Sequence, residues 1–253
     1  MTSQDKIIVL ITGGNQGVGY ETAKNLVLSS RDYHVILGSR DASKGEVAAQ
    51  EIQATEGVKG TTSSTQIDVT DDQSVDAAAE RVAAEYGRLD VLVNNAGIVS
   101  MVSPPTREVF RHVLETNVVG ALSVTEAFLD LLRKAIHKSP RLIFVSSSTG
   151  SITHASDPTS PYYNPGAVEY RTSKAALNML MVMYYARLKP EGFLVFGADP
   201  GLCATNFTGN PASLRERNAA EPWQGGERVA TVVKGEKDSY VGKVLGVYGV
   251  SPF

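Results

Sequence analysis

The sequence predicts an α/β fold, a doubly wound and mostly parallel sheet of about seven strands with helices on both faces. Short runs rich in Val, Ile, Leu or Phe alternate with longer segments of helical period, which is the pattern of repeated βαβ units. The runs have little polar interruption, as expected for strands that helices cover on both sides. No repeat, low-complexity tract or linker divides the 253 residues, so we expect a single domain over 1–253.

The elements can be placed in chain order. The expected strands are 6–12, 34–39, 65–69, 89–94, 141–146 and 193–198, with a last edge strand within 240–248. The expected helices are 18–29, 42–55, 72–86, 106–135 and 169–188. Acidic residues at 71–72 and the proline at 105 are typical of helix N-termini. Residues 153–167 hold three prolines and a glycine, which predicts a connection without regular structure.

Composition excludes several functional classes. Apolar residues make up 42% and charged residues 20%, and the net charge of -3 gives no reason to expect nucleic acid or a membrane as partner. Cys203 is the single cysteine, and the histidines His34, His112, His137 and His154 lack metal-ligand spacing, so we expect no metal. Residues 1–6 lack the layout of a signal peptide and no apolar run has membrane-spanning length, which predicts a cytoplasmic protein.

A glycine-rich turn follows the first strand and opens the first helix. The residues expected to hold a pyrophosphate are Gly13, Asn15, Gln16, Gly17, Val18 and Gly19. Glycines let the backbone approach the phosphates, and a helix N-terminus offers unpaired N–H groups to an anion. The spacing is G-x-x-x-G-x-G, and the alternative is a tight strand-to-helix turn with no ligand.

The tip of the second strand carries Ser39 and Arg40 where a carboxylate would otherwise receive the ribose hydroxyl. A guanidinium at this point accommodates a 2′-phosphate, so we expect NADP(H) to be preferred over NAD(H). The alternative is that Arg40 forms a surface ion pair with Asp41 or Glu46.

Tyr170 and Lys174 lie four residues apart in a predicted helix and therefore share one face. A lysine cation beside a phenol favours the phenolate and lowers the tyrosine pKa from its usual value of about 10. The pair taken alone is weak support for a site, because such spacing is common on solvated helices.

The order of these motifs resembles the short-chain dehydrogenase/reductase family nearly end to end. The matching residues are Thr12-Gly13-x-x-x-Gly17-x-Gly19, Asp68-Val69, Asn94-Asn95-Ala96-Gly97, Asn117, the serine cluster, Tyr170-x-x-x-Lys174 and Pro200-Gly201. The resemblance implies a Rossmann-type fold and an NADP(H)-dependent enzyme. The long connection from Ser147 to Tyr170 is similar to the carbonyl-reductase branch of that family.

The resemblance also assigns the cofactor contacts. Asp68 and Val69 would border the adenine, Asn95 and Ala96 of the Asn-Asn-Ala-Gly97 motif the adenosine ribose, and Pro200, Gly201 and Thr205 the nicotinamide. Two of these assignments have structural alternatives. Residues 94–97 could form only a turn after a strand, and Asp68 could be a helix-capping residue.

Four residues would carry the chemistry according to the resemblance. Ser147, chosen among three serines by the Ser-x-x-Gly pattern that ends at Gly150, would bind the substrate oxygen, and Tyr170 would protonate it. Lys174 would hold the nicotinamide ribose, and Asn117 would bind a water that relays protons to Lys174. The alternatives are a structural serine at a strand end and a satisfied core amide.

The predicted activity is NADPH-dependent reduction of a hydrophobic ketone, aldehyde or quinone. The alternatives are an alcohol dehydrogenase working oxidatively and a non-catalytic, dinucleotide-binding redox sensor. We expect substrate loops at about 153–167 and 202–225. His154, Tyr162 and Tyr163 would form one wall of the pocket or merely cover a surface helix, and residues 98–102 with Phe207 would form the other.

The oligomeric state is open at this point. Members of the family commonly associate through the helices that correspond to 106–135 and 169–188, and residues 177–185 are apolar nearly all round. We therefore expect a homodimer or homotetramer, with a monomer as the alternative.

Overall fold

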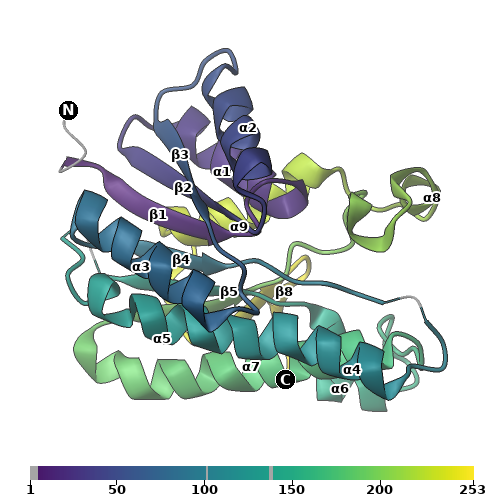
Figure 1. Ribbon diagram of the computed structural model, residues 1–253. Helices are drawn as coiled ribbons and strands as arrows, with labels where there is room; N and C mark the ends of the chain where they lie inside the picture. The colour runs from purple at the N-terminus through teal and green to yellow at the C-terminus, as the bar shows by residue number, and fades with distance from the viewer. Residues whose placement is uncertain (1–4, 101, 137–138) are drawn as a thin grey trace.

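A twisted sheet of eight strands runs through the centre of the computed structural model, which describes residues 5–100, 102–136 and 139–253 (Figure 1). The strand order is β3-β2-β1-β4-β5-β6-β7-β8, and only β7 and β8 pair in antiparallel fashion. The strands are β1 (Ile7–Thr12), β2 (Tyr33–Ser39), β3 (Thr61–Gln66), β4 (Val91–Asn94), β5 (Arg141–Val145), β6 (Leu194–Ala198), β7 (Val244–Gly246) and β8 (Gly249–Ser251). The predicted doubly wound, mostly parallel α/β fold is confirmed, with one strand more than expected.

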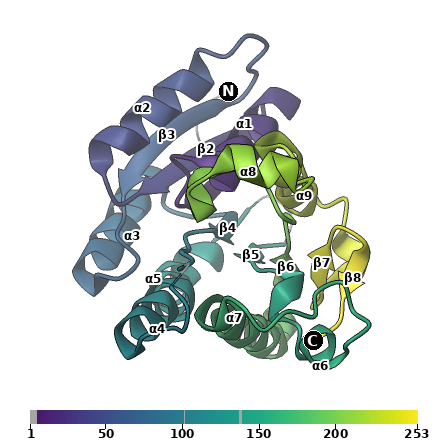
Figure 2. The same ribbon diagram turned by 90° about the vertical axis from the view of Figure 1, so that its right-hand side faces the viewer.

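Helices cover both faces of the sheet (Figures 1 and 2). They are α1 (Gly17–Ser29), α2 (Ala42–Gln53), α3 (Asp72–Tyr86), α4 (Arg107–Leu114), α5 (Gly120–Leu132), α6 (Ile152–Ser156), α7 (Val168–Leu188), α8 (Pro211–Glu216) and α9 (Pro222–Lys234). Apolar side chains of α1, α2 and α9 pack on one face, and those of α3, α5 and α7 pack on the other. The short helices α4, α6 and α8 lie near the carboxyl ends of the strands, on the right in Figure 1.

The third strand was predicted at 65–69, which is wrong. It is Thr61–Gln66, an edge strand that pairs only with β2 and consists of polar residues. The prediction was based on Ile67 and Val69, which are apolar. These residues are buried, but they follow the strand and pack into the core from the segment that connects β3 to α3. An edge strand covered on one face does not need the apolar run that marks a central strand.

The helix predicted over 106–135 is interrupted. Between α4 and α5 the segment Glu115–Val119 is π-helical, and Asn117 lies within it. The predicted irregular connection 153–167 is also partly ordered, because Ser151 caps the short helix α6 by accepting a hydrogen bond from His154 N. Helix α9 was not predicted, although Pro222 at its start and Gln224, whose side chain accepts from Glu221 N at 2.9 Å, mark its N-terminus.

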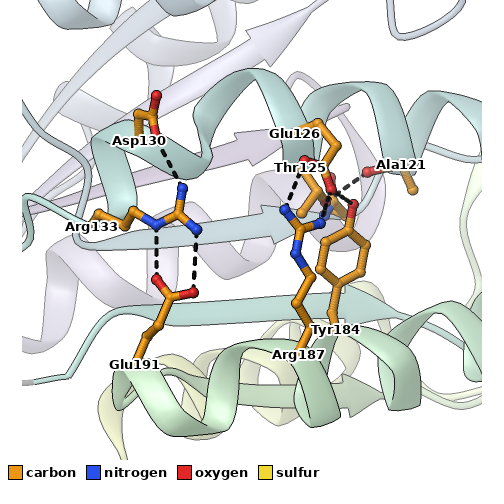
Figure 3. Close-up of polar contacts among 9 residues, drawn as sticks. Ala121, Thr125, Glu126, Asp130, Arg133, Tyr184, Arg187 and Glu191 are labelled. Carbon is orange, nitrogen blue, oxygen red and sulfur yellow. Dashed lines mark hydrogen bonds and ion pairs between the residues drawn. The ribbon is translucent and has the colours of Figure 1, made fainter.

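Surface ion pairs fasten α7 to its neighbour α5 (Figure 3). The Glu126 carboxylate accepts from Tyr184 at 2.6 Å and from Arg187 at 2.5 Å. Arg133, near the end of α5, bonds to Glu191 just beyond α7 at 2.8 Å. Together with the buried apolar residues of α7, these contacts hold the helix that carries Tyr170 and Lys174 against the sheet.

Candidate active site

The glycine-rich turn has the geometry of an anion site. Gly13 and Gly17 have φ of +62° and +58°, a backbone conformation that side chains disfavour. Gln16, at the start of α1, gives no side-chain cap, so the first N–H groups of the helix are open to an anion. The Asn95 amide donates to Thr12 O at 2.8 Å and to Gly13 O at 3.2 Å, which fixes the turn against the end of β4.

A large cavity, about 1540 Å³ in volume, extends from this turn along the carboxyl ends of the strands. The predicted cofactor residues that line it are Gly13, Asn15, Gln16, Gly17, Val18, Ser39, Arg40, Asp68, Val69, Asn95, Ala96, Gly97, Tyr170, Lys174, Pro200, Gly201 and Thr205. Gly19 lies behind the lining, where a Cβ would come within 2.5 Å of the Asn95 amide nitrogen. The uncapped helix, the glycine cradle and this volume fit a dinucleotide.

Arg40 lies exposed at the cavity rim, beyond the buried Ser39. The expected alternative fails in the described part of the chain, where none of the ion pairs involves Arg40 and Asp41 instead caps α2 by accepting from Lys44 N at 3.1 Å. Lys44 also lines the cavity, and the sequence analysis missed it. Lys44 could have been predicted from the sequence, because it is a second cation four residues after Arg40 at the start of a predicted helix.

The alternative reading of Asp68 as a helix cap is wrong, because its carboxylate bonds within the turn that precedes α3. Its carboxylate accepts from Thr70 N at 3.0 Å and from the Thr70 hydroxyl at 2.8 Å, which stabilises the turn before α3. The cap of α3 itself is Asp71, which accepts from Gln73 N. Asp68 borders the same cavity as Val69, so a role in the turn does not remove it from the candidate adenine site.

Tyr170 and Lys174 meet at the other end of the cavity. The Lys174 ammonium is 5.5 Å from the centre of the Tyr170 ring and donates to Val145 O at 2.8 Å. Burial lowers the pKa of Lys174 to about 8, and the negative charge of Asp199 opposes that shift.

The pKa of Tyr170 is raised rather than lowered as expected. Burial is the largest cause and the charge of Asp199 the second, while a hydrogen bond with the Ser147 hydroxyl acts in the opposite direction. The expectation is wrong because burial of the phenol dominates its pKa, while Lys174 directs its ammonium to a backbone carbonyl. Tyr170 is consequently held in the protonated form that a proton donor requires.

The three consecutive serines have different partners. The Ser146 hydroxyl donates to the Asn178 side chain, and Ser148 N donates to Asp199 at 2.7 Å. The Ser147 hydroxyl accepts from Thr149 N at 3.2 Å, lies 2.9 Å from the Thr149 hydroxyl and lines the cavity beside Tyr170. The family pattern therefore selected the serine whose hydroxyl lies beside the phenol.

Asn117 joins the turn after β4 to α7. Its side-chain oxygen accepts from Ile98 N at 2.8 Å, and its amide donates to Ile98 O and to the Ser173 hydroxyl, both at 2.9 Å. These contacts match the satisfied core amide. A Cβ at Gly97 would lie 3.3 Å from the Asn117 side-chain oxygen and 3.8 Å from the Lys174 ammonium. The side chains of Asn117 and Lys174 therefore both lie next to Gly97. The proton relay through Asn117 stays a prediction.

The long connection before α7 lines the end of the cavity that holds Tyr170. Tyr162 lines the cavity, His154 packs against its ring with centroids 4.9 Å apart, and Tyr163 is 53% exposed. From the opposite side, Phe207 meets the Tyr170 ring edge-on at 5.8 Å. Thr149 and Tyr248 also line this end and were not predicted, since neither belongs to a motif.

Of the predicted opposite wall, Ile98 and Val99 line the cavity, whereas Met101 lies outside the described residues. His137 and residues 1–4, named in the sequence analysis, also lie outside them. Within the described ranges no group of His, Cys, Asp and Glu could hold a metal ion, and no helix has the length and hydropathy to cross a membrane.

A dinucleotide-shaped cavity that ends at a tyrosine, a lysine and a serine defines a class of nicotinamide-dependent oxidoreductases. Residues 7–215 match the family model described as short chain dehydrogenase. The protein belongs to the short-chain dehydrogenase/reductase family.

Similar proteins span nearly the same length. The short-chain dehydrogenase/reductase tropE of Talaromyces stipitatus is 36% identical over 100% of both chains, and the short-chain dehydrogenase anuI of Penicillium roqueforti is 37% identical over 88% of both. A crystal structure of NADPH-bound carbonyl reductase from chicken fatty liver superposes with a TM-score of 0.82 and 27% identity, over 98% of this chain and 94% of that one.

Proposed function

We propose that the protein is an NADPH-dependent reductase that converts a hydrophobic ketone, aldehyde or quinone to the alcohol. The observation that carries the proposal is the pair of Tyr170 and Lys174, with the ammonium 5.5 Å from the ring centre, in the wall of a dinucleotide-sized cavity that Ser147 and Phe207 also line. The similarity to a carbonyl reductase that binds NADPH supports the choice of reaction and cofactor.

The site residues divide the tasks of this mechanism among them. The bound nicotinamide supplies the hydride. Ser147 donates a hydrogen bond to the substrate oxygen, where negative charge develops, and Tyr170 gives that oxygen its proton. The buried Lys174 cation, held by Val145 O, binds the cofactor ribose and compensates the charge that Tyr170 acquires. Arg40 and Lys44 bind the 2′-phosphate.

The partner in this proposal is a small hydrophobic carbonyl compound, and neither nucleic acid nor a membrane is required. The proposal also includes a cytoplasmic location. An oxidative direction uses the same residues with Tyr170 as base, so the substrate and the cellular cofactor ratio choose between the two directions.

Tyr170→Phe tests the proposal, because it removes the proton donor and keeps the ring. In a panel of hydrophobic ketones, aldehydes and quinones followed by NADPH absorbance, we expect wild-type turnover of about 1 s⁻¹ or faster. We expect kcat of the variant to fall by about 10² or more. Tyr240→Phe, at a tyrosine 45% exposed in the turn before β7, is the control and should match wild type.

Two results would contradict the proposal. Full activity of Tyr170→Phe would remove Tyr170 from the chemistry. NADPH binding without turnover of any compound class would favour the redox sensor, a function that needs no proton donor.

A further inference from the structure

A buried carboxylate outside the predicted site residues connects the two loops that carry the catalytic and nicotinamide ends of the cavity. Asp199 directly follows β6, is 4% exposed and lines the cavity. One carboxylate oxygen accepts from Ser148 N at 2.7 Å and the other from Gly201 N at 2.8 Å. Its own N–H donates to Leu245 O in β7, so the residue is anchored on three sides.

The two N–H bonds join segments that lie far apart in the sequence. Ser148 follows Ser147 in the loop after β5, and Gly201 belongs to the turn expected at the nicotinamide. Gly201 has φ of +77°, and its N–H bond to Asp199 secures this unusual conformation. Loss of the carboxylate would free both loops at once.

The carboxylate also faces titratable groups from every neighbouring element. They are Tyr170 and Lys174 from α7, Tyr162 from the connection before α7, and Cys203 from the segment after β6. Arg228 of α9 donates to Pro200 O at 2.5 Å and adds a cation on this side. Burial lowers the pKa of Lys174, and Asp199 is the one charged group that counteracts this effect. Its charge raises the pKa of Lys174 and so favours the ammonium form.

We propose that Asp199 is a positioning residue, which holds the Ser147 loop against the Pro200–Gly201 turn and places a carboxylate in the buried end of the cavity that Lys174 also lines. The inference rests on the proposed function for the task of Lys174 at the cofactor ribose. It requires neither a particular carbonyl substrate nor a preference for NADPH.

The test compares Asp199→Asn with Asp199→Glu. Asn is isosteric but neutral, and its NH₂ group cannot accept the second N–H bond, whereas Glu keeps the charge and moves it by one methylene. Dissociation constants of NADPH and of NADH are measured by cofactor fluorescence from pH 6.5 to 9, together with kcat and KM for any reduced substrate. Asp130→Asn, on the surface of α5 with a side chain 85% exposed, is the control for loss of one negative charge.

We expect Asp199→Asn to bind both cofactors more weakly, with a further loss of about threefold or more at pH 8.5 relative to pH 6.5, because each pKa unit changes the ratio of ammonium to amine tenfold. The alkaline limit of kcat should move to lower pH in parallel. Asp199→Glu should bind more weakly but keep the wild-type pH dependence, and Asp130→Asn should match wild type.

Several results would overturn the inference. A wild-type profile of Asp199→Asn would exclude any role. A loss of the same size at every pH would exclude the role of the charge. If Asp199→Asn does not fold, as judged by circular dichroism, a pH profile of Asp199→Glu displaced to lower pH would contradict the role of the charge. Because binding is measured without substrate, absence of carbonyl reduction leaves this test intact.

Discussion

Among the individual residues, a few charged side chains at the two ends of the cavity differ in their exposure to solvent. Arg40 and Lys44 are exposed at the end of the cavity where we propose that the 2′-phosphate binds, and water screens their charges there. Lys174 and Asp199 are buried at the other end, where charge acts strongly on its neighbours. Single substitutions at the two ends should therefore change different quantities.

Arg40→Ala should separate the two cofactors. We expect the KM for NADPH to rise about tenfold or more, because the variant loses a charge-assisted hydrogen bond to the 2′-phosphate. The KM for NADH should stay within about twofold of the wild-type value. Lys44→Ala should act in the same direction. Arg31→Ala, an exposed arginine in the turn between α1 and β2, is the control. Equal cofactor preference of wild type and Arg40→Ala would refute the assignment.

At the scale of the element, two local irregularities matter. The π-helical segment Glu115–Val119 directs Asn117 toward Ile98 and Ser173 and so connects the β4 loop to α7. The polar strand β3 is attached by side chains, since His34 of β2 contacts Thr61 and Ser63 of β3 and Tyr86 of α3 within 3.0 Å. This network substitutes for the apolar packing that the edge strand lacks.

His34 should make stability depend on pH. Burial, the largest cause, and the nearby Lys6 lower the pKa of His34 to about 4, against about 6.5 in the unfolded chain. The unfolded state then binds more protons between these values, so stability is complete above about pH 6.5 and declines as the pH falls toward 4. We expect the free energy of unfolding to drop by about 1–2 kcal/mol more between pH 7 and 5 in wild type than in His34→Gln.

The measurement is urea unfolding at the two pH values. His112→Gln, at an exposed position of α4, should keep the wild-type dependence on pH. The same decline in wild type and His34→Gln would show that His34 is not the group responsible.

At the scale of the whole molecule, the outer surface of α5 and α7 bears on association. Met179 and Met183 lie one turn apart on α7 and are 61% and 53% exposed, and Leu122 of α5 is 40% exposed. The charged residues of this surface in Figure 3 pair within the chain. Apolar surface between satisfied charges supports our proposal that this face pairs with a second copy.

Light scattering over a range of concentrations tests the association. We expect the wild-type mass to be twice 27.0 kDa or more, and Met179→Glu/Met183→Glu to shift it toward 27.0 kDa. Val47→Glu, at an exposed position of α2, should leave the mass unchanged. A wild-type mass of 27.0 kDa at all concentrations would establish the monomer.

Local patterns along the chain were enough to predict several features of the fold and the site. Apolar runs placed β1, β2, β4, β5 and β6, and the glycine spacing placed the phosphate turn, because a buried strand and a positive φ restrict the residues at each position. Motif order likewise brought Tyr170, Lys174 and Ser147 into one predicted site. The polar β3 escaped prediction because its neighbours, rather than its composition, make it a strand.

Other properties of the site depend on segments that are distant in the sequence and meet only in the folded chain. The raised pKa of Tyr170 comes from burial and from Asp199, which lies 29 positions further along the chain and reaches the phenol through the arrangement of β6 beside β5. Asp199 and Tyr248 join the cavity for the same reason. Charge and burial act through space, so no pattern along the chain specifies them.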